Sequence, residues 1–301
     1  VGSSTSLDLA SLTTVANLDV TGNVYVAAIS IADQFSLTGT TDQVVSGTVT
    51  HASGVDDDLI VSAAVRNVTF NSAVSVKDLT LGAGSTTTFD STVASVVTAL
   101  NGTSTFTGAV TLTGAATMAA GTTTTFSSTV GTDSDITGTT TANMTFNGAV
   151  TSTGNIAAGV GSTTAFNSTV SAVNLSNSGA MTLKGAVTLS GTMTTVSGST
   201  ITLGSAFKAG SAAAITAALT SVGTLDQTVN AVTVNVNNQF TTGTVVLFKN
   251  TAAALDSDDL ASFNVTDTAI VDYTAALSST AKAIEITANK RTTAGIATYL
   301  G

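Results

Sequence analysis

The chain has 301 residues, a net charge of −10 and one His, and it contains no Pro, Cys or Trp. Only 9% of the residues are charged and 5% are aromatic, whereas ordinary soluble domains are about 25% charged. These counts exclude disulfide scaffolds and cysteine zinc sites, and the eight Lys and Arg residues are too few for a nucleic-acid-binding face.

The residue types favour an all-β fold. Mean hydropathy is +0.43, but no run reaches the roughly 18 consecutive apolar residues that a membrane-spanning helix needs. Thr and Val are abundant, and both favour a pleated, half-buried backbone. The absence of Pro agrees, because Pro removes a donor from the strand ladder. We therefore expect strands throughout and no membrane span.

Residues 1–60 contain short alternating segments that are typical of strands. They are Leu18-Asp-Val-Thr-Gly-Asn-Val-Tyr-Val26, Ile29-Ser-Ile31 and Phe35-Ser-Leu37. We interpret them as coils of a repeat whose register is weaker than in the segment that follows.

Residues 61–204 contain a clear internal repeat of a five-residue segment. Each copy begins with an apolar residue and ends with Val, and the residue directly before this Val is Ala or Thr. The copies begin at Phe70, Phe89, Phe106, Phe126, Phe146, Phe166 and Leu183 and end at Val74, Val93, Val110, Val130, Val150, Val170 and Val187. Copies ending Ala-Val alternate with copies ending Thr-Val, so the full period is a pair of copies, as from Phe70 to Phe106 and from Phe106 to Phe146.

A period of about 20 residues with β-branched alternation predicts a β-solenoid, or parallel β-helix. Three strands of about four to five residues plus turns use about 20 residues per coil, so at most about 15 coils fit. An offset of four places the first residue and the Val of each copy on the same side of a strand, which we expect to face the interior. Stacked immunoglobulin-like sandwiches are the alternative, but they repeat at about 100 residues.

The frame disappears after about residue 204. Twelve charged residues lie in 205–301, against 14 in the longer segment 1–204. Alternation persists at Val232–Val236, Val245–Phe248 and Ile284–Ile286, and 209–219 has the composition of a short helix. We predict two parts: solenoid repeats at 1–204, and a divergent β region at 205–301 that covers the stack or contacts another subunit.

Several segments near the C-terminus carry a resemblance. They are Gly243-Thr-Val-Val-Leu-Phe248, Phe263-Asn-Val265, Ala283-Ile-Glu-Ile-Thr-Ala-Asn-Lys-Arg291 and Ala294-Gly-Ile-Ala297. They are similar to the junction that precedes the translocator barrel of bacterial autotransporters, and the Thr/Ala/Gly-rich coils resemble autotransporter passengers and surface-layer-like proteins. The resemblance implies a passenger cleaved from its barrel near Gly301, an extracellular or cell-surface location, and a structural, adhesive or matrix role. It carries over no catalytic residues.

His51 is the only His, so a two-His metal site is excluded. A Ser-His-Asp arrangement with Asp56, Asp57 or Asp58 is formally open, but no Gly-x-Ser-x-Gly elbow occurs. We interpret His51 as a solvated loop residue and expect no catalytic residue.

The acidic clusters are the only candidate metal ligands. They comprise Asp56, Asp57 and Asp58, the pair Asp133 and Asp135, and the cluster Asp256, Asp258 and Asp259. Adjacent carboxylates on a turn suit Ca²⁺, which binds six to eight oxygens, but the calcium-binding nonapeptide and the EF-hand pattern are absent. We expect solvated charge and no cofactor, with weak calcium sites at the first and last clusters as the alternative.

Two further patterns have structural explanations. Gly82-Ala-Gly84 and Gly159-Val-Gly161 lack the third glycine of a phosphate loop and are expected to mark coil turns. Asn-x-Ser/Thr sequons occur at Asn67, Asn101, Asn143 and Asn167, as expected by chance in a chain rich in Asn and Thr. Surface glycans are a partner that the sequence neither predicts nor excludes.

The function expected from these observations is structural. The ends of a solenoid present unpaired backbone groups that can pair with another chain, and few charges oppose this. We expect an extracellular homopolymer built by head-to-tail contacts, a filament or surface lattice. The alternatives are a monomeric adhesin passenger and a polysaccharide-active enzyme. The second would need grouped carboxylates, which Asp78, Asp90, Asp133 and Asp135 do not form in one coil phase, so we predict that the protein is not an enzyme.

Overall fold

The computed structural model describes residues 10–14, 16–51, 58–63, 67–196, 198–203, 219–221, 225–227, 232–236, 242–250, 254–261 and 263–300. The chain forms two compact units, Val1–Gly154 and Asn155–Gly301 (hereafter unit 1 and unit 2). With 56% strand and 5% helix, the chain is a β-solenoid whose parallel coils repeat about every 20 residues. The predicted fold class is confirmed.

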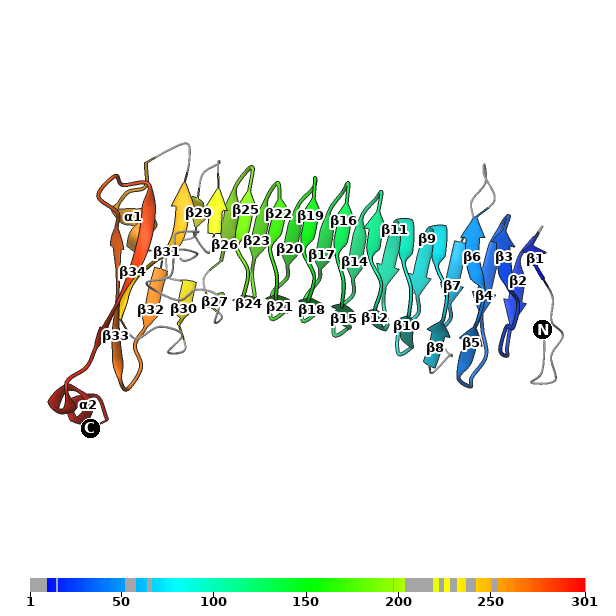
Figure 1. The fold of residues 1–301 in the computed structure, drawn as a ribbon, viewed down its shortest axis with the longest axis horizontal. Helices are drawn as coiled ribbons and strands as arrows, with labels where there is room; N and C mark the ends of the chain where they lie inside the picture. The colour runs from blue at the N-terminus through cyan, green and yellow to red at the C-terminus, as the bar shows by residue number, and fades with distance from the viewer. Residues whose placement is uncertain are drawn as a thin grey trace. The chain divides into compact units, whose positions relative to one another are not determined.

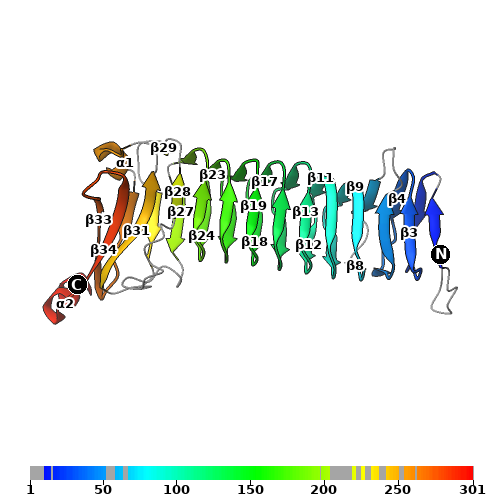
Figure 2. The same cartoon turned by 45° about the horizontal axis from the view of Figure 1, so that its top comes forward.

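In unit 1, three ladders of parallel strands, which we call faces 1, 2 and 3, enclose the interior (Figure 1, Figure 2). Face 1 contains β5 (Gln43–Val45), β8 (Asn67–Phe70), β10 (Thr86–Phe89), β12 (Thr103–Phe106), β15 (Thr123–Phe126) and β18 (Asn143–Phe146). Face 2 contains β1 (Leu12–Thr14), β3 (Ala28–Ile31), β6 (Thr48–His51), β13 (Val110–Leu112), β16 (Val130–Thr132) and β19 (Val150–Ser152).

Face 3 contains β2 (Leu18–Val20), β4 (Gln34–Leu37), β7 (Asp58–Val61), β14 (Ala116–Met118) and β17 (Ile136–Gly138). Two longer strands, β9 (Val74–Leu81) and β11 (Val93–Leu100), run through the corner and belong to faces 2 and 3. Most strands are about one residue shorter than the sequence predicts, because the corners use the remainder.

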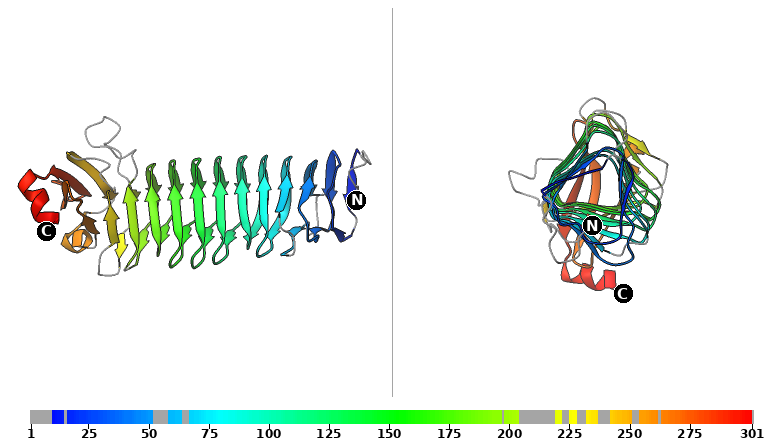
Figure 3. Two further views of the ribbon diagram at one scale, coloured as in Figure 1. Left: turned by 90° about the horizontal axis from the view of Figure 1, so that it is seen from below. Right: turned by 90° about the vertical axis from the view of Figure 1, so that its right-hand side faces the viewer.

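The repeated phenylalanines form one buried column behind face 1. Phe70, Phe89, Phe106, Phe126 and Phe146 occupy successive register positions, and none is more than 2% exposed. Their neighbouring ring centroids are 4.8 to 5.0 Å apart with planes within 11° of parallel, which matches the spacing of hydrogen-bonded strands, about 4.7–4.9 Å. The Val of each copy is buried on face 2, so both positions face inward as predicted. The prediction that they share one strand is wrong: each Phe ends a strand of face 1 and each Val begins the next strand, as at Phe70 and Val74, because a coil corner lies between them. Seen end-on, the strands surround a common interior (Figure 3).

Two glycines in Ala-Val copies of unit 1 stand where adjacent coils approach closely. A Cβ added at Gly108 would lie 2.4 Å from the carbonyl carbon of Ser91, and one at Gly148 would lie 2.3 Å from that of Ser128. Each of these glycines belongs to an Ala-Val copy and each serine to the preceding Thr-Val copy. Backbone of adjacent coils therefore approaches so closely here that these Ala-Val copies need glycine.

The corner between faces 3 and 1 uses a left-handed residue. Gly84 and Gly121 adopt φ of +82° and +73° there, and Gly161 of unit 2 adopts +68°, which confirms the two Gly-x-Gly segments as coil turns. Thr141 occupies the same position with φ of 61°, a conformation that costs a β-branched residue free energy.

Replacing Thr141 with Gly is expected to raise the free energy of unfolding. The relief of left-handed strain is about 1–2 kcal/mol, and the entropy that Gly adds to the unfolded chain offsets about 0.5–1 kcal/mol of it. Urea titration followed by circular dichroism measures the difference, with Gly121→Thr as the reverse control, which is expected to destabilise. A less stable T141G variant would show that the turn prefers threonine.

Unit 2 begins with three parallel ladders of the same kind. Its face 1 contains β21 (Thr163–Phe166), β24 (Ala180–Leu183), β27 (Thr200–Leu203), β30 (Val232–Asn235) and β32 (Phe263–Thr266). Its face 2 contains β22 (Val170–Ala172), β25 (Val187–Leu189), β28 (Leu219–Ser221) and β31 (Gly243–Asn250). Its face 3 contains β20 (Ile156–Ala158), β23 (Leu175–Asn177), β26 (Met193–Thr195) and β29 (Leu225–Gln227).

The parallel ladders continue beyond residue 204, although the sequence frame does not. β27 pairs with β30 and β30 with β32, all in parallel. The pairing then becomes antiparallel: β34 (Ala283–Lys290) lies between β31 and β33 (Val271–Leu277). Two helices, α1 (Ser257–Ala261) and α2 (Thr293–Leu300), complete the unit. Most of the helix expected at 209–219 lies outside the described residues, and Leu219 begins β28.

Candidate functional site

His51 is the exposed last residue of β6 rather than a loop residue, and it lies beside a shallow groove on unit 1. The groove has a volume of about 200 Å³ and is lined by His51, Ser75, Val76, Ala94, Ser95, Val96, Thr111 and Thr113. No carboxylate is among these residues. Asp58 lies at the start of β7 on face 3, and Asp56 and Asp57 lie outside the described residues. The groove therefore offers an imidazole, hydroxyls and an exposed Val96, and none of the aspartates of the hypothetical triad lines it.

The structure places Asp58 in register with Asp78 on the next coil, so two carboxylates are neighbours along face 3. Within the described part of the chain no group of three or more His, Cys, Asp or Glu side chains has a geometry suited to a metal ion. Calcium binding by Asp56, Asp57 and Asp58 stays a prediction.

The second calcium candidate, Asp256, Asp258 and Asp259, forms the start of helix α1. Oδ1 of Asp256 accepts the N–H groups of Asp258 and Asp259 at 2.9 and 3.1 Å. In return, Oδ2 of Asp259 accepts the Asp256 N–H at 2.9 Å. This reciprocal pattern is a capping box, which gives the cluster a structural role, and calcium binding there also stays a prediction.

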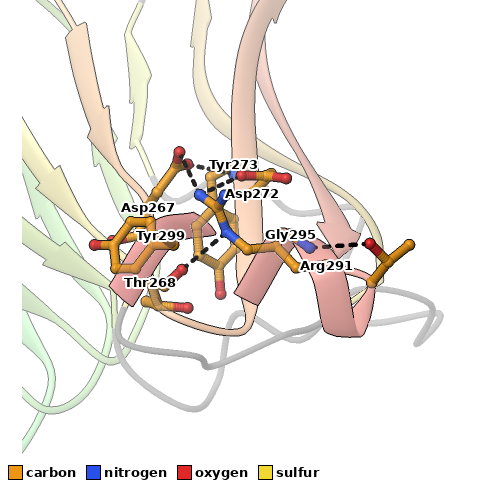
Figure 4. Close-up of polar contacts among 8 residues, drawn as sticks. Asp267, Thr268, Asp272, Tyr273, Arg291, Gly295 and Tyr299 are labelled. Carbon is orange, nitrogen blue, oxygen red and sulfur yellow. Dashed lines mark hydrogen bonds and ion pairs between the residues drawn. The ribbon is translucent and has the colours of Figure 1, made fainter. Parts of the chain in front are cut away.

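Unit 2 contains a charged cluster around Arg291 that the sequence did not predict (Figure 4). The Arg291 side chain is 14% exposed, and its guanidinium donates to the carboxylate of Asp267 at 3.0 Å and pairs with Asp272. It also stacks on the ring of Tyr299, 4.5 Å from the centroid. The Tyr299 hydroxyl donates to the Asp267 carbonyl at 3.4 Å.

The Arg291 cluster fixes α2 against the loop between β32 and β33. Two acids and an aromatic ring from different elements meet at one planar cation, an arrangement that Lys would not reproduce. Asp267 precedes β33, Asp272 lies within β33, and Arg291 follows β34. Most of the β33–β34 strand pair lies between the two acids and Arg291 in sequence. No local sequence motif therefore predicts the cluster. Its groups satisfy one another, which indicates a structural role.

Face 1 of unit 1 presents threonines outward. In β10 the burial alternates, with Thr86 exposed, Thr87 buried, Thr88 half-buried and Phe89 buried. The same alternation holds for β8, β12, β15 and β18. Each strand therefore directs its first and third side chains to solvent.

The sequons lie on or beside face 1 of unit 1 and face 1 of unit 2. Asn67 and Asn143 begin β8 and β18, Asn101 precedes β12, and Asn167 follows β21. The Asn67 amide donates to Asp42 at 2.8 Å, so it has a partner within the chain. Glycan attachment stays a prediction.

Among the described residues, no helix is long and apolar enough to cross a membrane. No protein-family model, curated protein or solved structure matches the chain. The β-solenoid is compatible with an autotransporter passenger, and that resemblance remains a hypothesis.

Proposed function

We propose that this chain is an extracellular structural protein that assembles head-to-tail with copies of itself into a filament or surface lattice. The observation that carries the proposal is an edge of β33 in unit 2 that pairs with no strand among the described residues. Backbone groups on such an edge can pair with a strand of another chain.

The directions of the β33 backbone groups follow from two contacts. The Tyr273 N–H donates to Oδ1 of Asp267 at 2.8 Å, and the Val271 carbonyl accepts the Thr268 N–H at 3.0 Å. The backbone N–H and carbonyl groups of Val271 and Tyr273 therefore point away from β34. In an antiparallel pair alternate residues face alternate sides, so Ala275 and Leu277 also direct their N–H and carbonyl groups outward. Within the described residues these groups have no hydrogen-bond partner.

The first coil of unit 1 offers complementary edges. β1 pairs with β3 and β2 pairs with β4, and neither strand has a second partner in the described part of the chain. Asp19 is the only charged residue of the two strands, so little repulsion opposes pairing with a strand such as β33. Natural edge strands that avoid association use charges or Pro, and β33 contains one Asp and no Pro.

Replacing Ala275 with Pro tests this proposal. Pro removes the outward N–H, and Pro is tolerated where that N–H faces away from the partner strand. The concentration needed for assembly is expected to rise by about tenfold, because the lost hydrogen bond and the added ring weaken the contact by about 1.4 kcal/mol.

The measurements are multi-angle light scattering over a concentration series and negative-stain microscopy of the intact chain. Ala275→Val is the matched control, because it keeps the N–H and is expected to assemble normally. A wild-type chain that stays monomeric at high concentration would exclude the homopolymer. Equal assembly of A275P and A275V would show that β33 is not the contact.

One observation supports the second candidate, a monomeric cell-surface adhesin passenger. The segments that carry the autotransporter resemblance form β31, β32, β34 and α2, and among them β34 pairs antiparallel with β31 and covers it. A covered strand suits a stalk that ends there. This candidate predicts a dispersed monomer in the same light-scattering series, so one experiment separates the two functions.

A further inference from the structure

Face 1 of unit 1 carries a two-dimensional array of threonines. The third residues of five successive strands form one column in strict register, Thr69, Thr88, Thr105, Thr125 and Thr145. The first residues of the same strands form a second column, which contains three threonines between two asparagines. The array is two side chains wide and five coils long.

The spacing of the array is fixed in both directions. Across the strands it equals the coil spacing, which the 4.8–5.0 Å separations of the underlying phenylalanine rings reproduce. Along a strand, alternate residues are about 6.6 Å apart. Threonine side chains have restricted χ1 angles, so the hydroxyl and methyl groups are held in place before any ligand arrives.

The hydroxyls of this array have no partner among the described residues. None of the eight threonine side chains in the two columns makes a hydrogen bond within that part of the chain. Threonines at coil turns differ: the hydroxyls of Thr122 and Thr139 donate to backbone carbonyls at 2.7 and 3.0 Å. The hydrogen-bonding capacity of these columns is therefore left to solvent or to an external surface.

The array also lacks charge. The chain has a net charge of −10, yet β8, β10, β12, β15 and β18 contain no charged residue and no outward aromatic ring. Charged side chains lie beside the face, as at Asp90, which follows β10. A surface without charge is electrostatically matched to an uncharged partner.

We propose that face 1 of unit 1 adsorbs to ice. A ligand that contacts all columns at once must repeat in two dimensions, and a crystal surface does so whereas a single small molecule does not. Because the hydroxyl and methyl groups are fixed before contact, little ordering of the protein is required when a regular surface binds. Crystalline polysaccharide is the less favoured surface, because sugar rings are usually bound by aromatic side chains. This inference is independent of the proposed self-assembly.

The test is partition of the intact chain into slowly grown ice, with microscopy of ice crystal shape as the second measurement. The wild-type chain is expected to enter the ice fraction. Thr105→Lys places a charged, bulky side chain at the centre of the array and is expected to reduce incorporation by about tenfold. Thr117→Lys, at an exposed position on β14 of face 3, is the matched control and is expected to bind as the wild type does.

Thr105→Ser serves as a second variant that keeps the hydroxyl and the fold. Because it removes the fixed methyl group, it is expected to lower incorporation while its circular dichroism spectrum is unchanged. Exclusion of the wild-type chain from ice would overturn the proposal, as would equal incorporation of T105K and T117K. Binding to crystalline cellulose or chitin without binding to ice would assign the face to polysaccharide instead.

Discussion

Replacing Phe126 with Ala is expected to lower the free energy of unfolding by about 3–5 kcal/mol, the range for phenylalanine truncated in a packed core. Phe126 is 2% exposed, and its ring lies between those of Phe106 and Phe146, 5.0 Å from each centroid. The truncation leaves a cavity and also removes two ring contacts, each of which contributes beyond the buried area. Collapse is restricted, because the strands on both sides are fixed by their ladders.

Urea titration followed by far-ultraviolet circular dichroism measures this loss. Phe126→Leu is the control, because Leu183 occupies the equivalent position on the coil that follows Phe166. The Leu variant is expected to lose about 1.5 kcal/mol or less. Repeat stacks can unfold in parts, so the Ala variant is also expected to broaden the transition as neighbouring coils uncouple. An F126A variant as stable as F126L would show that the column is not tightly packed.

The fold was accessible from sequence because its main determinant repeats. Phe70 to Phe146 and the Val four residues later in each copy mark the same two inward positions in every coil. A parallel stack at one strand spacing is the arrangement that buries all of them. Even the alternation between Ala-Val and Thr-Val copies was visible as a pattern. The close approach of Gly148 to Ser128 was not, because it depends on atoms of two coils.

Contacts that do not recur from coil to coil could not be predicted from the sequence. The Arg291 cluster joins Asp267, Asp272 and Tyr299 through tertiary folding of unit 2, and nothing in the spacing of these residues marks them as neighbours. The change from parallel to antiparallel pairing after β31 also depends on non-local pairing. The number of coils is smaller than the upper limit from sequence because of that change and because the late coils are longer: in register, Val187 of β25 pairs with Leu219 of β28, and Thr200 of β27 pairs with Thr233 of β30.

In the candidate sites too, the residue types could be predicted from the sequence but their contacts could not. The acidic clusters stood out by composition, yet the structure gives Asp256 and Asp259 capping contacts that a sequence of adjacent carboxylates does not reveal. The threonines of face 1 were hidden by their abundance, because Thr is common throughout the chain. Only the register separates Thr105, in an unbroken column, from Thr122, whose hydroxyl is used by its own turn.

Replacing Gly148 with Ala is expected to destabilise unit 1 by about 3 kcal/mol, the upper end of the range for overpacking. The added Cβ would lie 2.3 Å from the carbonyl carbon and oxygen of Ser128. Both are backbone atoms, and no side-chain rotation relieves the contact. The neighbouring strands β15 and β18 are joined in register, so separating them at this corner also strains their ladder.

The matched control is Gly131→Ala, in β16 of the same unit. A Cβ added at Gly131 meets nothing within 4 Å, and its φ is not positive. This variant is expected to be stabilised by about 0.4–1 kcal/mol, because alanine restricts the unfolded chain. Urea titration of both variants measures a gap of about 3–4 kcal/mol if the close approach of coils is real. Equal stability would mean that packing does not require glycine at position 148.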